Sequence, residues 1–240
     1  MENARVSTLR PRERLIVALD VPEADDARAL VREIGDAAEF YKIGLELVMR
    51  GGLQLVRELA DKGHKIFLDM KLLDIANTVE KATRNAAQSG ATFLTIHAVD
   101  GKSIRAAAAG AEGTALKVLG VTVLTSLDAA DLKEQGLSAS PEEMVVARAR
   151  MAQKNGIAGV IASGLEAKAV RNTTGAGFLI VTPGIRFADD AVGDQARVMT
   201  PDRAIAAGAD YLVVGRPITA AASPRAAAER FVDAIASARP

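Results

Sequence analysis

The chain has 240 residues, and its 30 Lys and Arg residues balance 30 Asp and Glu residues. A net charge of zero argues against a general polyanion-binding surface, so we expect no nucleic-acid partner. The absence of cysteine excludes disulfides and thiolate metal sites. Residues 1–14 lack the apolar segment of a secretory signal, and no apolar run approaches the ~20 residues of a membrane helix. These features predict a cytoplasmic protein with no membrane partner.

The composition also indicates the kind of core. Hydrophobic residues make up 49% of the chain, whereas aromatic residues make up only 3% and tryptophan is absent. We therefore expect a large core built from Ala, Val, Leu and Ile, which suits parallel strands covered by helices. The length is close to the ~250 residues typical of a single (β/α)₈ barrel.

Short β-branched segments recur along the chain, and each is followed by a segment with apolar residues at helical spacing. The clearest predicted helices are 23–34, 79–88 and 141–154. A glycine ends the helical pattern just before several strands, as at Gly63, Gly90, Gly156 and Gly208. The predicted strands are 15–20, 40–43, 65–71, 93–97, 117–124, 159–163, 178–182 and 211–215.

Uninterrupted alternation of strands and helices implies parallel strands joined by right-handed crossovers. Eight such units predict an α/β fold with one closed (β/α)₈ TIM barrel, a single catalytic domain spanning residues 1–240. An open doubly wound sheet is the alternative, but no G-x-G-x-x-G follows the first strand.

Two segments after strands are longer than the rest, 125–140 and 183–199. Both belong to the carboxyl-terminal face, where barrel active sites lie. The second contains Gly184, Asp189, Asp190 and Gly193, a composition that suits a mobile lid.

The third strand ends in Asp69-Met70-Lys71-Leu72-Leu73-Asp74. Because residues i and i+2 of a strand point the same way, Asp69 and Lys71 should project together into the barrel mouth, with Met70 packed outward. Asp74 lies beyond the strand and need not face its own barrel. The alternative interpretation is a strand-end salt bridge with Asp74 as a helix N-cap.

Other strand ends carry charges as well. Asp20 ends the first strand, Lys42 lies in the second, and His97 ends the fourth. Isolated charges there could be solvated rim residues, but several converging on one face indicate chemistry. Lysines interleaved with aspartates also compensate each other's charge, as burial requires.

A phosphate site is predicted after the last two strands. Loops after strands seven and eight of barrels commonly bind phosphate through backbone N–H groups. Gly215 permits close approach of the backbone, and Arg216 offers a bidentate donor. Arg186 and Gln195 are candidate second contacts to the same phosphate. The alternative is a surface loop with ordinary charges.

Several segments resemble those of the orotidine 5'-phosphate decarboxylase family, in the same order and from residue 19 to 218. The D-x-K-x-x-D element is shared with sister decarboxylases and synthases, whereas Leu-Thr-Ser and Thr-Pro-Gly-Ile-Arg are more particular to this family. The segments are Leu19-Asp20, Tyr41-Lys42-Ile43-Gly44, Phe67 to Thr78, Leu124-Thr125-Ser126, Thr182-Pro183-Gly184-Ile185-Arg186 and Val214-Gly215-Arg216-Pro217-Ile218.

The resemblance implies a role for each matching residue. Lys71 and Asp69 would lie against the reacting carbon of the pyrimidine, and Lys42 with Asp74 would keep Lys71 protonated and oriented. The remaining implied contacts are Asp20 and Lys42 to the ribose, Thr125, Ser126 and Pro183 to the base, Arg186, Gln195, Gly215 and Arg216 to the phosphate, and Asp74, Ile75 and Thr78 to the site of a second subunit in a homodimer.

The implied reaction is conversion of orotidine 5'-phosphate to UMP and CO₂, a step of pyrimidine nucleotide biosynthesis, with no cofactor and no metal. Lys71 would stabilise the carbanion at C6 by its fixed charge and then protonate it. One alternative is a sugar-phosphate decarboxylase or synthase of the same superfamily that binds Mg²⁺ through D-x-K-x-x-D. Another is a catalytically silent phosphometabolite-binding protein, which would not need both Lys71 and Asp69.

Overall fold

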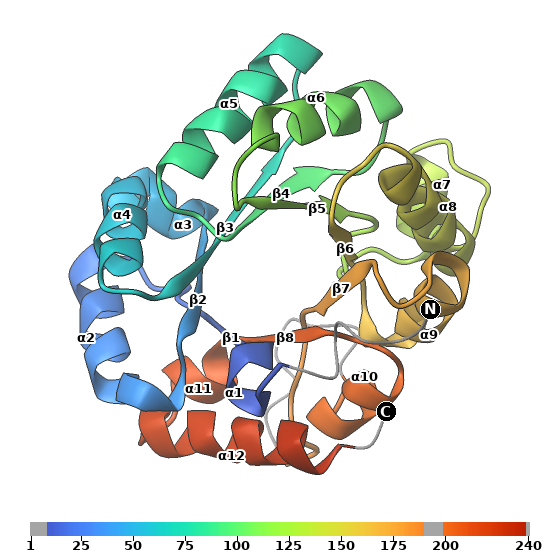
Figure 1. Cartoon of the computed structure of the whole chain (residues 1–240). Coiled ribbons are helices and arrows are strands. Elements are labelled where there is room, and N and C mark those ends of the chain that lie inside the picture. Colours follow the sequence, from blue (N-terminus) through green and yellow to red (C-terminus); the bar gives the residue numbers. More distant parts are fainter. Residues whose placement is uncertain (1–8, 190–198, 239–240) are drawn as a thin grey trace.

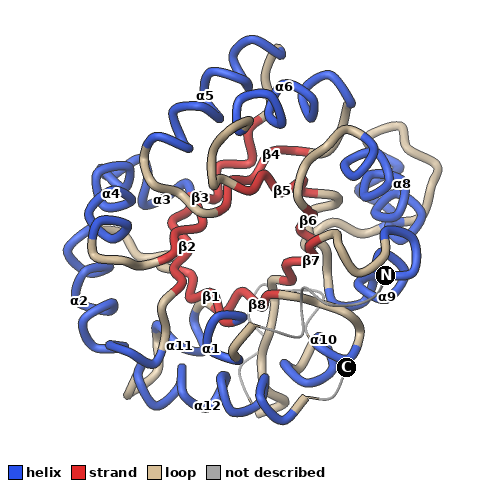
Figure 2. Tube along the Cα trace, viewed as in Figure 1, coloured by secondary structure: helices blue, strands red, loops and turns tan. Residues whose placement is uncertain are grey.

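The computed structural model describes residues 9–189 and 199–238. Eight parallel strands follow one another around a closed barrel in the order β1 to β8, and β1 pairs with β8 to complete it (Figure 1). Helices surround the ring of strands on its outside (Figure 2). The predicted (β/α)₈ TIM barrel is confirmed.

The strands are β1 (Leu15–Ala18), β2 (Phe40–Gly44), β3 (Lys65–Leu72), β4 (Phe93–His97), β5 (Lys117–Val121), β6 (Gly159–Ile161), β7 (Leu179–Thr182) and β8 (Tyr211–Val214). The helices are α1 (Pro11–Arg14), α2 (Ala24–Ile34), η1 (Gly35–Ala37), α3 (Leu45–Leu47), η2 (Val48–Gly52), α4 (Leu53–Asp61), α5 (Ala76–Gln88), α6 (Gly101–Ala111), α7 (Ala129–Glu134), α8 (Pro141–Lys154), α9 (Gly164–Thr174), α10 (Pro201–Ala206), α11 (Arg216–Thr219) and α12 (Pro224–Ser237).

The predicted strands differ from the observed ones mainly at their carboxyl ends. Beyond the end of β1, for example, the Leu19 N–H still donates to the Lys42 carbonyl at 2.9 Å, although the strand itself ends at Ala18. The four predicted helix-ending glycines all have φ between +84° and +101°, which confirms them. Only glycine adopts such angles without steric cost.

The two long segments that follow strands β5 and β7 contain local structure that the sequence analysis did not predict. The first contains the short helix α7, whose N-cap Asp128 accepts hydrogen bonds from the backbone of Ala130 and Asp131. In the second, Ile185 bridges to Met199, and Asp189 is bound by Arg230 of α12 at 2.9 Å. The predicted lid residues Asp190 and Gly193 lie outside the described residues.

The barrel interior contradicts the expectation of an aliphatic core. Four of the eight aromatic residues pack there: Phe40, Phe67, Phe93 and Tyr211. Phe93 lies at the centre, with ring centroids 5.0 Å from Phe40 and 5.1 Å from Tyr211. The low aromatic content of the whole chain therefore hid a local cluster of aromatic rings. These rings fill the barrel interior below its mouth.

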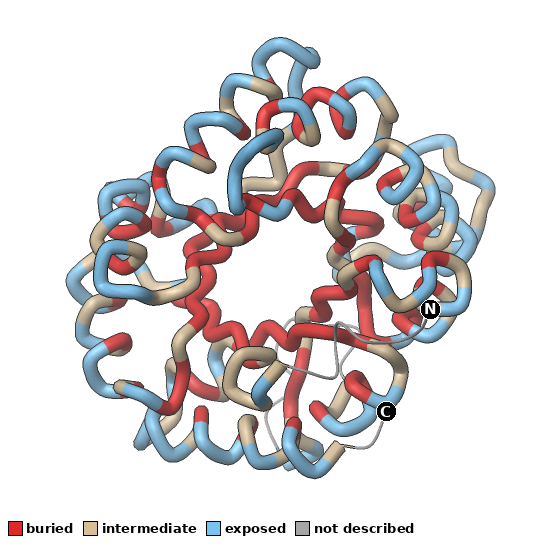
Figure 3. The backbone as a smooth tube through the Cα atoms, in the orientation of Figure 1, coloured by how far each residue is buried: buried red, intermediate tan, exposed pale blue. Residues whose placement is uncertain are grey.

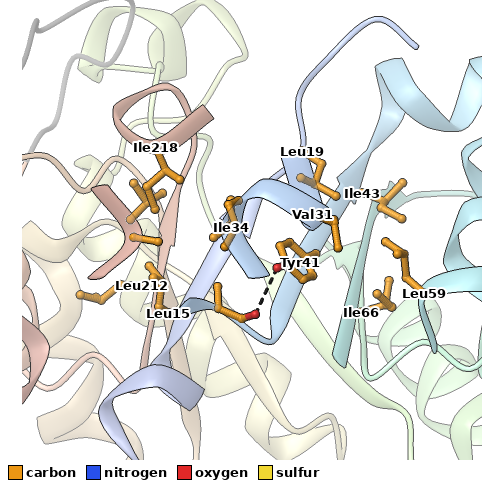
Figure 4. Packing of buried hydrophobic residues seen from close by; sticks show 14 of the residues in the cluster. Leu15, Leu19, Val31, Ile34, Tyr41, Ile43, Leu59, Ile66, Leu212 and Ile218 are labelled. Carbon is orange, nitrogen blue, oxygen red and sulfur yellow. Dashed lines mark hydrogen bonds between the residues drawn. The ribbon is translucent and has the colours of Figure 1, made fainter. Parts of the chain in front are cut away.

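The layer between strands and helices is aliphatic, as predicted. Outward residues of β1, β2 and β8 pack against α2 and α4 in one cluster (Figure 4). The buried aromatic exceptions in this cluster are Tyr41 and Phe231, and the Tyr41 hydroxyl donates to the Ala38 carbonyl at 3.1 Å. The strands are buried, and the helices expose their outer faces (Figure 3). Among the helices that the structure describes, none is long and apolar enough to cross a membrane.

Candidate active site

The inward positions of β2, β3 and β4 change from aromatic to polar toward the carboxyl ends of the strands. Because side chains alternate between the two faces of a strand, each inward row is read at every second residue. These rows are Phe40 and Lys42; Phe67, Asp69 and Lys71; and Phe93, Thr95 and His97. The strands therefore place charge at the barrel mouth, above an aromatic floor.

Four charged residues form a continuous chain at this mouth. Lys42 Nζ lies 2.7 Å from Asp20 Oδ1 and 3.6 Å from Asp69 Oδ2. Lys71 Nζ lies 2.8 Å from the same Asp69 oxygen. Lys42 and Asp69 are buried, whereas the side chains of Lys71 and Asp20 are 31% and 53% exposed. The buried charges are thus compensated, and the exposed ends face the pocket.

Gly44 allows the Lys42–Asp20 pair to lie across the end of β2. A Cβ at this position would meet Lys42 Nζ at 3.0 Å and Asp20 Oδ1 at 3.2 Å, tighter than ordinary contacts. Gly44 belonged to a resembling segment but was not predicted as a site residue. Only the contact geometry shows that a side chain there would press against the charged ends of Lys42 and Asp20.

The environment of Asp69 holds it in the ionised form. Burial is the largest single influence and opposes ionisation, but the charges of Lys42 and Lys71 and hydrogen bonds from Lys71 and Thr95 outweigh it. The pKa of Asp69 is therefore lowered. Asp69 can act as a fixed negative charge between two ammonium groups.

Lys71 sits on an irregular backbone. It has φ of +51°, the only positive value for a non-glycine residue in the described chain. The register between β3 and β4 shifts between Leu68 and Leu72, around this residue. The Lys71 N–H donates to Thr95 Oγ1 at 3.0 Å instead of joining a regular ladder. Thr95 was not predicted, although its place between inward Phe93 and His97 was a signal in the sequence.

A pocket of about 470 Å³ opens at the mouth, a size that suits a small ligand. Apolar residues such as Phe67, Ile161 and Val213 contribute to its lining. Nine of the predicted site residues also line it: Asp20, Lys42, Asp69, Lys71, Thr125, Pro183, Arg186, Gly215 and Arg216. Lysines from β2 and β3 thus share one pocket with arginines that follow β7 and β8.

Four predicted residues do not line this pocket: Asp74, Ile75, Thr78 and Ser126. All four side chains are exposed. Asp74 accepts a hydrogen bond from the backbone of Ile75 at 2.6 Å, and Ile75, not Asp74, is the N-cap of α5. The alternative interpretation of Asp74 as a helix cap is therefore wrong. Gln195 lies outside the described residues.

His97 does not line the pocket either. Its pKa is lowered, chiefly by burial and then by the positive charges of Lys71 and Arg148. His97 is therefore neutral near pH 7 and adds no positive charge to the mouth. As for metals, the residues that the structure describes include no group of three or more His, Cys, Asp or Glu side chains arranged to hold an ion.

A (β/α)₈ barrel that gathers lysines, aspartates and arginines in one pocket at its strand ends is the architecture of an enzyme acting on a small anionic molecule. The sequence model of the orotidine 5'-phosphate decarboxylase / HUMPS family matches residues 13–231. The chain belongs to this family, as the resemblance predicted.

Individual relatives agree with this assignment. A protein of Afipia carboxidovorans named orotidine 5'-phosphate decarboxylase is 54% identical over 226 residues, which cover 94% of this chain and 96% of that protein. One of the same name from Methylorubrum extorquens is 54% identical and covers 92% and 95% of the two chains. The crystal structure of orotidine 5'-phosphate decarboxylase from Lactobacillus acidophilus superposes with a TM-score of 0.83 at 37% identity, over 93% of this chain and 99% of that one.

Proposed function

We propose that the chain converts orotidine 5'-phosphate to UMP and CO₂, the decarboxylation step of pyrimidine nucleotide biosynthesis, and that it needs no cofactor. The observation that carries the proposal is the Asp20–Lys42–Asp69–Lys71 chain of charges in a pocket that also holds Arg186 and Arg216. The names of the relatives supply the substrate, which has the required anionic phosphate and carboxylate groups.

In the proposed reaction the bond between C6 and the carboxylate breaks, CO₂ leaves, and the electron pair stays on C6. Lys71 stabilises this carbanion by its ammonium charge and then donates a proton from Nζ to C6, which gives UMP. The neutral amine regains its proton from solvent. Fixed charges suit this task because they need no reorganisation as charge develops.

Asp69 and Lys42 prepare Lys71 for this step. Asp69 binds the ammonium group at 2.8 Å, and its lowered pKa keeps it anionic while it does so. Lys42 lies 3.6 Å from the same carboxylate oxygen and also binds Asp20. Lys42 and Asp20 together would hold the ribose. In this proposal the negative charge of Asp69 also faces the carboxylate that leaves.

The other contacts bind parts of the substrate that do not react. Thr125, Ser126 and Pro183 would contact the base, and Arg186, Gln195, Gly215 and Arg216 would bind the phosphate. Support comes from the two arginines in the pocket wall, of which Arg186 is buried. Binding energy from remote groups can be used in the transition state, for example through closure of a loop that excludes water.

The direct test is to incubate purified protein with orotidine 5'-phosphate in EDTA and follow the loss of ultraviolet absorbance as the pyrimidine loses its carboxylate. We expect full activity in the chelator. Activity that disappears in EDTA and returns with Mg²⁺ would contradict the cofactor-free reaction and would indicate a metal site at D-x-K-x-x-D. No turnover under either condition would contradict the proposal and favour the sugar-phosphate decarboxylase or synthase instead.

We further propose that the functional unit is a homodimer with shared active sites. Support comes from an exposed apolar surface on the segments after β2, β3 and β4, which are neighbours in the barrel. Exposed large apolar side chains gathered on neighbouring segments are typical of a protein interface. Its residues are Leu45, Met49, Leu53, Leu73, Ile75 and Val99, and Met49 and Ile75 are 84% and 72% exposed.

The predicted partner-site residues lie in this same region. Ile75 belongs to the apolar surface, and Asp74 and Thr78 are exposed beside it. In a two-fold dimer both chains present the same surface, so each chain contributes the same residues to its partner's active site. Asp74 of one chain would then approach Lys71 of the other.

Mixing two inactive variants tests the shared site. Lys71→Ala and Asp74→Ala subunits should complement each other, because one site of a hybrid dimer collects both defects and the other collects neither. Random reassortment should restore about a quarter of wild-type activity per site, as the isologous geometry requires. Hybrid dimers that form but stay inactive would show that Asp74 serves its own chain.

A further inference from the structure

The contacts of Thr95 point to a role in positioning both Asp69 and Lys71, and we infer that its hydroxyl fixes the catalytic geometry of β3 from the neighbouring strand. The Thr95 hydroxyl donates to Asp69 Oδ1 at 2.8 Å and accepts the Lys71 N–H at 3.0 Å. Thr95 is completely buried and does not line the pocket. This inference rests on the proposed function.

The first contact orients the carboxylate. A hydroxyl has one donor, and here that donor is directed at Asp69 Oδ1. The other carboxylate oxygen, Oδ2, is the one that binds Lys71 at 2.8 Å and lies 3.6 Å from Lys42. The Thr95 hydroxyl therefore holds Oδ1, so that Oδ2 faces the two lysines. The same hydrogen bond favours the ionised form of Asp69.

The second contact stabilises a disfavoured backbone. With φ of +51°, Lys71 lies in the left-handed region, which side-chain-bearing residues rarely adopt. Such outliers persist where surrounding structure holds them, and they cluster at functional sites. The register shift between Leu68 and Leu72 leaves the Lys71 N–H without a ladder partner, and Thr95 Oγ1 takes the place of the missing carbonyl. Since backbone angles set the direction of a side chain, this bond helps direct Lys71 Nζ into the pocket.

Thr95→Val tests the inference because it keeps the side-chain shape and removes only the hydroxyl. We expect kcat for orotidine 5'-phosphate to fall about tenfold or more, since two hydrogen bonds, one of them to a charged group, are lost. KM and the affinity for UMP should change much less, because the ribose and phosphate contacts remain. The acidic limb of the kcat–pH profile should move to higher pH, because Asp69 loses a donor that favours its ionised form.

Two variants serve as controls. Thr95→Ser keeps the hydroxyl and should retain most of kcat. Thr83→Val makes the same chemical change at a completely buried threonine of α5 whose hydroxyl has no hydrogen-bond partner in the described chain. It should leave kcat and the pH profile unchanged, whatever its effect on thermal stability.

The outcomes separate this inference from the proposed function. An inactive wild-type protein would contradict the function, whereas an active wild type with an unchanged Thr95→Val variant would overturn the role of Thr95. Equal losses in Thr95→Val and Thr83→Val would also overturn it. A crystal structure of Thr95→Val gives a second measurement that needs no substrate. We expect Lys71 to leave the left-handed region or its ammonium to move away from Asp69, and unchanged geometry would refute the inference.

Discussion

The two ends of the barrel both gather charged residues, but their charges have different partners. At the mouth, the ammonium groups of Lys42 and Lys71 contact only carboxylates among the described residues. At the opposite end, Arg14 and Arg171 donate mainly to backbone carbonyls. An ammonium group has three donors, so Lys71, with one carboxylate partner, retains donors directed at the pocket.

At the opposite end, where the strands begin (the lower end), the charged side chains stabilise the fold. Arg171 donates to the carbonyls of Gly175, Phe178 and Gly208 and binds Asp210 at 2.8 Å. Asp210 in turn accepts the N–H of Ile180 at 2.7 Å. These bonds tie together the entries to β7 and β8. Residue type alone thus does not separate a site from a structural cluster, whereas ammonium donors left facing a pocket, as at Lys71, do.

Lys71→Ala and Lys65→Ala compare the two ends on a single strand, because both lysines belong to β3. Lys71→Ala should lower turnover by about 10⁴-fold or more, since it removes both a fixed charge and a proton donor. The fold and much of the UMP affinity should persist. Steady-state kinetics and circular dichroism measure the two effects.

Lys65→Ala is the matched control. Lys65 binds Glu13 at 3.0 Å and Glu39 at 3.3 Å, and its side chain is 38% exposed. Pairs of this kind contribute about 1 kcal/mol or less, so activity should stay near the wild-type value. Near-normal decarboxylation by Lys71→Ala, or a comparable loss in Lys65→Ala, would remove the distinction between the two ends.

Arg171→Ala should affect stability and not catalysis. It leaves the Asp210 carboxylate, which is 2% exposed, without its ion pair, a change that costs about 3–5 kcal/mol. Burial already raises the pKa of Asp210, with Arg171 as the main opposing charge, so the variant should lose more stability at neutral than at acidic pH. Urea unfolding measures the loss. Reduced activity per folded molecule would mean that the two ends are coupled.

Arg216→Ala is the counterpart at the mouth. Catalytic efficiency should fall by about 10²–10³-fold, the range found when a preorganised polar contact is removed, with little change in unfolding free energy. Added guanidinium should recover part of the loss. A defect confined to UMP binding, with kcat/KM unchanged, would show that the phosphate contact is not used in the transition state.

Much of this architecture could be predicted from the sequence, because alternation and strand-end position are local properties. The eight strands follow from periodicity, and the inward pair Asp69 and Lys71 follows from their spacing. The same rule applied to 93–97 would have found Thr95. The assumption of an aliphatic core obscured the aromatic floor, which the spacing of Phe40 and Lys42 already indicated.

The remaining features depend on relations between strands. The register shift opposite Thr95 and the positive φ of Lys71 arise from how β3 meets β4, and no pattern within either strand encodes them. The tight contacts at Gly44 likewise depend on a side chain two residues earlier that pairs with Asp20. Whether Asp74 acts in a second subunit depends on another copy of the chain, so it stays a prediction.

The smallest expected effect concerns Glu13 at the lower end. Its pKa is lowered from 4.5 to about 2, chiefly by a hydrogen bond from the Arg10 backbone and then by hydrogen bonds from Lys65 and Arg10. A carboxyl group with a lowered pKa in the folded state contributes stability that is fully present above the unfolded value and is lost as pH falls toward the folded one. Glu13 should therefore stabilise the protein fully above about pH 4.5 and progressively less down to about pH 2.

Glu13→Gln removes this titration. At neutral pH it should cost about 1 kcal/mol, the scale of a partly exposed ion pair. Between pH 4.5 and about 2 the unfolding free energy of the variant should fall less steeply than that of the wild type, so the two curves converge. Urea unfolding across this pH range measures the slopes, and Asp69→Asn serves for comparison, because it removes a carboxyl of lowered pKa at the mouth. Parallel curves for Glu13→Gln and wild type would show that Glu13 is not a structural charge, and the contrast between the two ends would then rest on the arginines alone.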